Sequence, residues 1–468
     1  MSESQTNLAW DTLLELGEGR HGPLHARLSG AIREAIRGGR LPAGSALPPS
    51  RELAADLGCS RWVVTEAYAQ LAAEGYVEAR IGSGTRVRPL GGAAAADPAA
   101  EAPPALAPRI DLAPGLPDLR AFPLGRWLAA LRSVAGTLPY AELGYPDPAG
   151  HPRLRQVLAG YLARVRGAQV DPAQVTVCRG VTDGTSRVCQ ALRAAGITAV
   201  AVEDPGWHRL REAAAGTGLR VVPTRVDGHG LRVGDLDADP AVRAVVVSPT
   251  HQFPTGVVLP AERRAALLAW ARRVDGLILE DDYDAEFRYD RRPIAALQGL
   301  APERIVLVGS LSKSVAQAFG LGWAIIPAEI RARVRLPESA RPSTLEQVAL
   351  AHFITSGDLE RHLRAARGRF RRRRAALLEA LTLELPDLSV TGVAAGMHAV
   401  LELPPGVRAA DVRSAAAELD VGVSDLNRYR ASGRTPTAEA LVLGYGNLSD
   451  ALVDEAVGRL ARVIRTLG

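Results

Sequence analysis

Short runs of apolar residues, separated by polar turns and helix-like stretches, recur through the larger part of this chain. Five of them have the length of strands and not of ordinary helices, and they cover residues 175–178, 199–203, 244–248, 277–281 and 305–309. Continuous apolar runs, unlike alternating ones, are typical of strands that are buried on both faces of a sheet. The pattern therefore predicts an α/β domain with a mostly parallel sheet and covering helices.

A segment rich in proline, alanine and glycine divides the sequence. Residues 89–108 show no apolar period, and their composition is typical of a semi-rigid linker. At 468 residues the chain is also long for a single domain. We therefore expect an N-terminal domain at 1–88, a linker at 89–108 and a larger C-terminal domain at 109–468.

The N-terminal domain carries the signals of three helices and a hairpin. Apolar residues recur every four positions along the first helix, at Leu24, Leu28, Ile32 and Ile36. Ser50 is placed to cap a helix over 51–57, and Ser60 to cap a third helix whose inward residues are Val63, Val64, Ala67 and Leu71. Short strands at 76–80 and 85–88 flank a glycine-tipped turn. This order predicts a winged helix-turn-helix.

The charge of this domain favours DNA as its partner. From Arg20 to Arg88 there are ten arginines and six acidic residues, an excess of 10 − 6 = +4, which suits a phosphate backbone. The third helix would place Arg61, Trp62 and Thr65 in the major groove, while Ser60 and the helix N-terminus hold a phosphate. The alternative is a protein-interaction module with solvated charges.

Lysine and arginine together number 56, and a single one of these residues, Lys313, is a lysine. Arginine serves wherever a fixed positive charge is needed, but a Schiff base requires a primary amine that can lose its proton. Lys313 follows a predicted strand and lies among hydroxyl residues, in Gly309-Ser310-Leu311-Ser312-Lys313-Ser314. This isolation favours a covalently held aldehyde cofactor. The alternative is a leftover surface lysine in an arginine-rich chain.

Carboxylate and phenol side chains at the end of another strand suit pyridoxal phosphate. Asp281 and Tyr283 lie two residues apart, so both face one side, where the carboxylate can meet the ring nitrogen and the phenol the 3-hydroxyl. Glu280 and Asp282 point the other way. The alternative for this segment is a solvated acidic loop.

Two further segments would complete such a site. Trp207 can stack on the ring of the cofactor, with buried packing as its alternative. The turn at 180–184 follows the strand 175–178 and opens a helix, whose backbone N–H groups are placed to cradle the phosphate.

The sequence favours a soluble, cytoplasmic protein without a metal. The three cysteines, Cys59, Cys178 and Cys189, show no metal-binding spacing, and sparse cysteines are typical of reduced thiols in a cytosol. The first ten residues lack the basic and apolar regions of a signal peptide. No stretch approaches the roughly 18 apolar residues of a membrane helix.

Five blocks of the first domain resemble the GntR-type DNA-binding domain in sequence and order, at 47–54, 57–61, 67–71, 74–77 and 82–85. This resemblance implies that DNA is contacted by Arg51, Ser60, Arg61 and Thr65, and by the wing residues Gly82, Ser83, Gly84 and Thr85. Trp62 departs from the pattern, in which a small polar residue is usual.

The larger domain resembles the fold-type I aminotransferases, and nearly the whole chain outside the linker resembles the MocR family of bacterial transcriptional regulators. The resemblance rests on blocks at 145–150, 203–207, 248–256, 280–289 and 310–313. It implies a Schiff base of pyridoxal phosphate on Lys313, Asp281 on the pyridine nitrogen, Tyr283 near the 3-hydroxyl and Trp207 on the ring.

The same resemblance implies further cofactor contacts. They place His251 and Gln252 along the ring and Tyr145 at the phosphate of a neighbouring subunit in a homodimer. From the phosphate turn and the hydroxyls around Lys313, we also expect Val181, Thr182, Ser310 and Ser312 to contact the cofactor.

Three positions depart from the aminotransferase pattern. The arginine that usually follows the lysine by seven residues is replaced by Gly320. Arg179 stands before the phosphate turn, where a small hydroxyl residue is common, and it is a candidate for the missing charge. Val442 replaces the arginine that holds a substrate carboxylate, for which Arg428 and Arg430 are the nearby candidates.

We therefore expect a dimeric regulator that binds double-stranded operator DNA. Its aminotransferase-like domain would sense pyridoxal phosphate, alone or with an amino-acid or amine effector, with little or no transaminase turnover. One alternative is a working aminotransferase with an attached DNA-binding module. Another is a regulator whose cofactor site is degenerate.

Overall fold

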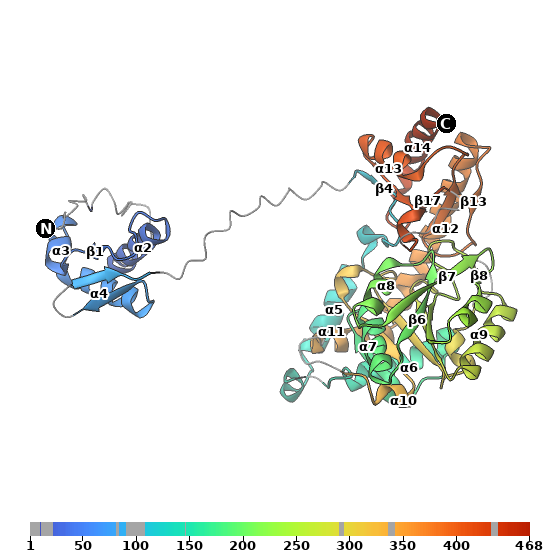
Figure 1. Cartoon of the computed structure of the whole chain (residues 1–468), viewed down its shortest axis with the longest axis horizontal. Helices are drawn as coiled ribbons and strands as arrows, with labels where there is room; N and C mark the ends of the chain where they lie inside the picture. The colour runs from blue at the N-terminus through green and yellow to red at the C-terminus, as the bar shows by residue number, and fades with distance from the viewer. Residues whose placement is uncertain are drawn as a thin grey trace. The chain divides into compact units, whose positions relative to one another are not determined.

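The computed structural model describes residue 10 and residues 22–80, 84–89, 108–145, 147–289, 294–335, 342–431 and 439–468. The chain divides into two compact units, residues 1–106 and 107–468 (Figure 1). The predicted linker lies almost wholly outside the described residues.

The first unit has the predicted winged helix-turn-helix fold. Its helices are α2 (Leu24–Arg37), α3 (Ser50–Asp56) and α4 (Arg61–Ala73), and its strands are β1 (Ala46–Leu47), β2 (Val77–Arg80) and β3 (Gly84–Val87). The strands form an antiparallel sheet in the order β1-β3-β2. Periodic apolar residues of all three helices meet in one core, which includes Leu28, Ile32, Leu53, Val64 and Leu71.

Three details of this unit differ from the predictions. Ser50 is the first residue of α3 and not its cap, because Pro49 holds the N-cap position with its fixed backbone angle. The Ser50 hydroxyl instead accepts a hydrogen bond from Arg61 Nε at 3.2 Å. Ser60 does hold the N-cap position of α4, but its side chain makes no capping bond. Leu24 is 37% exposed and lies outside the core.

The second unit is built on an eight-stranded sheet (Figure 1). Its order is β5 (Val175–Cys178), β12 (Gly322–Ile325), β11 (Ile305–Ser310), β10 (Leu277–Asp282), β9 (Val242–Val247), β6 (Ala199–Asp204), β7 (Arg220–Asp227) and β8 (Gly230–Leu231). Strands β11, β10, β9, β6 and β7 are parallel neighbours, whereas β12, β5 and β8 pair antiparallel.

All five predicted strands of this sheet are present, and three were missed: β12, β7 and the two-residue β8. Strand β12 is only four residues long, and β7 is interrupted by Pro223 and Arg225, so neither forms a long apolar run. The neighbouring edge strand β8 pairs with only two residues of β7, Val226 and Asp227, so Pro223 breaks no pairing with it.

Helices cover both faces of the sheet, as continuous apolar strands require. Successive residues of a strand enter different clusters: Val200 and Val246 pack with α7 (Val181–Ala194) and α8 (His208–Ala215). Ala201 and Val245 pack on the other face with α9 (Ala261–Arg273). Further helices of this unit are α5 (Leu124–Ala135), α6 (Pro152–Arg166), α10 (Ala328–Arg331) and α11 (Thr344–Thr355).

The long helix α12 (Asp358–Glu384) leads from the sheet region to a C-terminal subdomain (Figure 1). Four strands form an antiparallel sheet there: β13 (Val390–Thr391), β14 (His398–Glu402), β17 (Ala440–Gly444) and β16 (Ser424–Asp425). Helices α13 (Ala409–Glu418) and α14 (Val453–Leu467) pack with it. The pair β4 (Ile110–Asp111) and β15 (Val421–Gly422) ties the start of this unit to the subdomain.

No helix among the described residues is both long and apolar enough to span a membrane.

Candidate functional site

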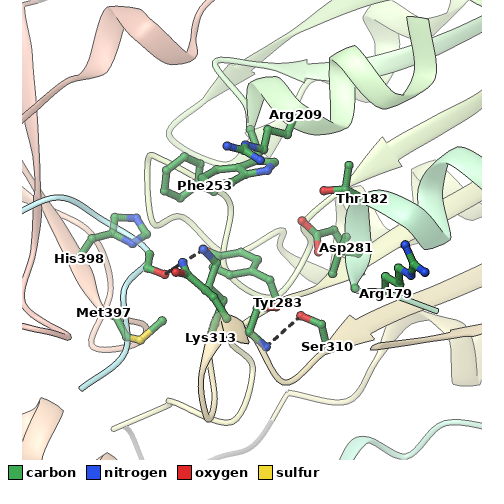
Figure 2. Close-up of a pocket in the computed structure, with 16 residues that line it drawn as sticks. Arg179, Thr182, Arg209, Phe253, Asp281, Tyr283, Ser310, Lys313, Met397 and His398 are labelled. Carbon is green, nitrogen blue, oxygen red and sulfur yellow. Dashed lines mark hydrogen bonds between the residues drawn. The ribbon is translucent and has the colours of Figure 1, made fainter. Parts of the chain in front are cut away.

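A cavity of about 390 Å³ opens where β10 and β11 end and α7 begins (Figure 2). Eight of the residues predicted for the cofactor line it: Val181, Thr182, Trp207, Asp281, Tyr283, Ser310, Ser312 and Lys313. Segments more than a hundred residues apart in the sequence therefore meet at this point.

Lys313 follows β11 and extends its amine into the cavity. Its Nζ donates a hydrogen bond to Gly115 O at 2.8 Å and lies 4.8 Å from the centre of the Trp207 ring. Burial lowers the pKa of Lys313, while the carboxylates of Asp281 and Asp284 oppose this shift. A partly desolvated amine with a lowered pKa is the form of lysine that attacks a carbonyl.

Strand β10 presents alternate side chains to opposite sides, as its sequence predicts. Asp281 and Tyr283 line the cavity. Glu280 points away and accepts hydrogen bonds from the backbone N–H groups of Leu297 and Gln298, both at 2.9 Å. Asp282 also points away and forms a buried ion pair with the guanidinium of a residue in α6.

Asp281 offers an unused acceptor to the cavity. Its Oδ1 is buried and has no hydrogen-bond partner among the described residues. Burial raises its pKa well above the ordinary value, and the charges of Asp282, Asp284 and Glu203 raise it further. A cationic N–H donor in the cavity would satisfy this oxygen and stabilise the ionised carboxylate. The protonated pyridine nitrogen of pyridoxal phosphate is such a donor.

The first turn of α7 forms an anion-binding surface on the cavity wall. Gly180, at the N-cap, has φ 110°, a backbone conformation that few residues other than glycine adopt. The helix N-terminus therefore opens at Val181 and Thr182, beside the hydroxyls of Ser310 and Ser312. N–H groups at a helix start and neighbouring hydroxyls are suited to phosphate.

Asp183 also lies in this turn, but its charge is engaged. Its carboxylate accepts from the backbone N–H of Arg179 at 2.8 Å and pairs with Arg187 Nε at 2.9 Å. Arg179 itself lines the cavity close to Asp281 and Thr182 in the view of Figure 2.

Three residues expected at the cofactor do not line the cavity. His251 is buried behind Tyr283, with its Nδ1 3.0 Å from the tyrosine hydroxyl. Tyr145 is 95% exposed and borders a separate surface hollow. Gln252, implied beside the ring, is fully buried and donates to the carbonyls of Pro205 and Phe253.

Six residues that line the cavity were not predicted from the sequence: Gly115, Arg209, Phe253, Gln317, Met397 and His398. Arg209 lies two residues after Trp207 in the sequence. Its closeness to a residue predicted to stack on the cofactor could have indicated that its charge reaches the same site. Met397 and His398 precede or begin β14, far from every motif in sequence, and lie opposite Arg179 and Asp281 in Figure 2. No local pattern predicted them.

The two positions where an arginine is missing, Gly320 and Val442, both lie outside the lining of the cavity. Gly320 ends a short helical turn in a left-handed conformation, φ 53°, and does not line the cavity. Val442 is fully buried in an apolar cluster on β17. Neither Arg428 nor Arg430 borders the cavity, so the guanidinium groups among its described lining residues are those of Arg179 and Arg209.

In the first unit, the residues predicted to contact DNA gather at the starts of α3 and α4. Arg51, Ser60, Arg61 and Thr65 are all exposed. The hydroxyl of Thr65 donates to Arg61 O at 2.9 Å. Trp62 is 64% exposed, an unusual setting for so large an apolar side chain.

The predicted wing is described only in part. Gly84 and Thr85 begin β3, whereas Gly82 and Ser83 lie outside the described residues.

Two family descriptions match the chain. Residues 24–87 match "Bacterial regulatory proteins, gntR family", and residues 111–460 match "Aminotransferase class I and II". In structure, the chain is similar to an archaeal alanine:glyoxylate aminotransferase with a TM-score of 0.70 and 25% identity, over 76% of this chain and 91% of that one. The fold-type I aminotransferase fold of the second unit is thereby confirmed.

Relatives that contain both parts are regulators. The chain is 33% identical to the HTH-type pyridoxine biosynthesis transcriptional regulator PdxR of Corynebacterium glutamicum, over 90% of this chain and 91% of the relative. It is 31% identical to the probable rhizopine catabolism regulatory protein MocR of Rhizobium meliloti, over 94% and 93%. The chain therefore belongs to the MocR family of transcriptional regulators, in which a GntR-type DNA-binding domain precedes an aminotransferase-like domain.

Proposed function

We propose that this regulator binds pyridoxal phosphate covalently through Lys313 and that its affinity for operator DNA depends on occupancy of this site. The observation that carries the proposal is the cavity itself. It brings the only lysine of the chain together with a buried carboxylate oxygen that has no partner among the described residues.

The other residues of the cavity have complementary roles in this proposal. Asp281 would receive the pyridine N–H, Tyr283 would donate to the ring oxygen, and Trp207 would pack on the ring face. The start of α7 with Thr182 would hold the phosphate. When bound, pyridoxal phosphate supplies an aldehyde that captures primary amines and a ring that withdraws electrons.

Arg179 is our candidate for the positive charge that Gly320 does not supply. It stands at the phosphate end of the cavity, next to the helix N-terminus. Guanidinium groups bind phosphate oxygens in a fixed fork geometry.

Arg209 favours a second ligand beside the cofactor. It lies in the first turn of α8, next to Trp207, and borders the cavity that holds Lys313. We therefore include, as the second form of the proposal, an amino compound with an acidic group that Arg209 would bind.

We also propose a homodimer, the typical assembly of this family. Two tyrosines, Tyr140 and Tyr145, are 92% and 95% exposed on neighbouring parts of the surface. Large exposed aromatic side chains are enriched at protein interfaces. Tyr145 would then reach the cofactor phosphate of a second copy.

Regulation follows from linkage between the two ligands. Pyridoxal phosphate can change the DNA affinity only if it binds one arrangement of the protein better than another, and DNA must then change the cofactor affinity by the same factor.

The absence of other lysines gives a clean test of the covalent site. The full-length protein is incubated with pyridoxal phosphate, reduced with borohydride and mapped by mass spectrometry. We expect the label on Lys313, and the peptide map distinguishes it from the α-amino group, the only other primary amine of the sequence. Lys313→Ala should lose both the label and the visible absorbance band.

Lys313→Arg is the matched control, since it keeps a positive charge but cannot form the covalent bond. A wild-type protein that carries no label at Lys313 contradicts the proposal. A labelled protein whose DNA affinity is equal with and without pyridoxal phosphate contradicts the regulatory part only.

A further inference from the structure

We propose that His251, held by Asp284, positions the hydroxyl of Tyr283 so that its proton is directed to the cofactor. The inference rests on the proposed cofactor site and assigns a positioning role to two residues outside the lining of the cavity.

The three side chains form a compact buried group. His251 Nδ1 lies 2.7 Å from Asp284 Oδ2 and 3.0 Å from the Tyr283 hydroxyl. The side chains of His251 and Asp284 are each only 2% exposed, so water does not compete for these hydrogen bonds.

The Asp284 carboxylate determines which nitrogen of the imidazole carries the proton. A carboxylate at 2.7 Å requires a donor, so Nδ1 is protonated. The same N–H then faces the tyrosine oxygen, which can only accept from it. The proton of Tyr283 remains available for another acceptor.

Two acceptors compete for that tyrosine proton. The Asp284 carboxylate is one of them, and it contributes with burial and with Asp281 to a pKa of Tyr283 well above the ordinary value. An oxygen of a ligand in the cavity is the other, because Tyr283 lines the cavity. The His251 N–H engages Asp284 and thereby weakens the first acceptor, which favours donation into the cavity.

The backbone around the imidazole is shaped to hold it. Gly396 has φ +69°, and a Cβ atom there would lie 2.1 Å from His251 Cε1 and 2.7 Å from Asp284 Oδ2. The Tyr445 hydroxyl donates to Gly396 O at 3.1 Å and fixes this loop over the ring. Any side chain at position 396 would displace the pair.

The second nitrogen of His251 also distinguishes this residue from a purely structural histidine. Nε2 is buried and has no hydrogen-bond partner among the described residues, although buried polar atoms are nearly always paired. The hydrogen bonds of this imidazole are therefore made by Nδ1 and not by Nε2.

Other titratable groups around the tyrosine are consistent with this role. Those facing Tyr283, besides His251 and Asp284, are Asp281, Glu203, His398 and Lys313. Burial and the neighbouring His251 lower the pKa of His398 to about 3, so it is neutral and its Nε2–H donates to Pro254 O at 3.0 Å. The single ring proton of His398 is therefore engaged at Pro254 O and is not donated to the Tyr283 oxygen.

Paired amide substitutions test the assignment. The amide nitrogen of His251→Asn overlays Nδ1 and can still donate to Asp284 and Tyr283, whereas that of His251→Gln overlays Nε2. The readout is the pH at which the visible absorbance band of the reconstituted full-length protein titrates. The negative charge on the ring oxygen stabilises a proton on the Lys313 nitrogen. A hydrogen bond from Tyr283 to the ring oxygen reduces that charge and so lowers the pKa of the Lys313 nitrogen.

We expect His251→Gln to raise the titration midpoint by about 0.5–1 pH unit, the worth of one hydrogen bond, as Tyr283→Phe should. His251→Asn should titrate close to the wild type. In a Tyr283→Phe background, His251→Gln should add no further shift, because its effect passes through the missing hydroxyl.

Three results would overturn the inference. They are a wild-type midpoint in His251→Gln, an equal shift in His251→Asn and His251→Gln, or an additional shift in the Tyr283→Phe background. Thermal unfolding of each variant verifies that it is folded. If His251→Gln does not fold, an unshifted midpoint in Tyr283→Phe overturns the inference instead. A wild-type protein without the Lys313-dependent band contradicts the proposed function itself, and with it this inference.

Discussion

Glu203 is an ionisable residue buried close to the cavity, and it has no cationic partner among the groups that shift its pKa. It is the last residue but one of β6, before Asp204, and its carboxylate accepts hydrogen bonds from Ser248 N at 3.1 Å and Gln252 Nε2 at 3.4 Å. Burial raises its pKa to about 8, and these hydrogen bonds only partly oppose the shift. The folded protein therefore binds a proton that the unfolded chain releases near pH 4.5.

This shift predicts that Glu203 makes stability fall as pH rises. Between about pH 4.5 and 8 the folded state holds more protons at this residue, so its contribution to the free energy of unfolding decreases, by at most about 5 kcal/mol. Glu203→Gln removes the titration. Denaturant unfolding at pH 5 and pH 8 should show a smaller loss for the variant, and parallel losses would contradict the shift.

The exposed arginines of the first unit have different expected effects on DNA binding. Arg61 begins the recognition helix α4, and Arg51 lies in the first turn of α3. Arg61→Ala should cost about 1–3 kcal/mol and relax the preference at one base position. Arg51→Ala should weaken all sequences alike and reduce the salt dependence by about one phosphate contact.

Titrations at two salt concentrations, on the promoter region beside the gene and on random duplex, separate the two effects. Arg37→Ala is a suitable control, because its guanidinium lies over the Tyr76 ring, 5.4 Å from the centre. If neither Arg61→Ala nor Arg51→Ala alters binding, the predicted interface is wrong.

At the scale of elements, the side chains of β10 alternate between the cavity on one side and a buried ion pair with α6 on the other. Its inward residues serve the cavity, and its outward Asp282 fixes the strand to α6 through Arg166, with Nε and Nη2 at 2.8 and 2.9 Å from the carboxylate. Arg166 also donates to the carbonyl of Ile294 at 2.6 Å. Both ionised side chains are almost fully buried, so each depends on the other for its charge balance.

Removal of one member of this pair should destabilise the second unit strongly. We expect Arg166→Ala to lower the free energy of unfolding by about 3–5 kcal/mol, because it leaves a buried carboxylate without its counter-charge. Arg166→Met with Asp282→Leu should recover much of that loss. Denaturant titration of both variants checks this, and a single variant as stable as the wild type would contradict it.

Strand β10 also shows how far the sequence alone could predict the site. Period-two alternation correctly placed Asp281 and Tyr283 on one side and Glu280 and Asp282 on the other. Contacts that form only when distant segments fold together could not be predicted from any local sequence pattern. Gly115 and His398 reach the cavity from segments about two hundred and about a hundred residues from their neighbours there, and nothing local marks them.

The fold was predictable for a related reason. Apolar period and length determine buried strands and amphipathic helices locally, and both units follow those patterns. Helix starts were less predictable, because Pro49 and Ser50 are both common there and only the tertiary contact with Arg61 determines what the serine hydroxyl does.

For the whole molecule, a domain with the fold of an aminotransferase is part of a transcriptional regulator. The position expected to bind a substrate carboxylate is Val442, which packs with Phe253, Leu426 and Tyr429 in an apolar cluster. A bidentate arginine contact is difficult to replace. An amino acid held at Arg209 would therefore still lack the anchor at position 442 that orients the substrate for transamination.

We accordingly expect little or no turnover from the protein loaded with pyridoxal phosphate. Conversion of amino acids to keto acids, followed in a coupled assay, should remain far below the roughly 1 per second of ordinary enzymes. Sustained conversion at that rate would favour a working aminotransferase with an attached DNA-binding module. Loss of the same activity in Lys313→Ala would assign it to this cavity.

The single lysine has one more consequence, for proteolysis. A protease that cuts only after lysine has one bond to cleave in all 468 residues, the bond between Lys313 and Ser314. Ser314 is 3% exposed and the lysine is held in the cavity wall, so cleavage requires this region to open locally. Each opening long enough for cleavage yields two fragments of known size. The rate at which these fragments appear therefore measures how often the cavity region opens.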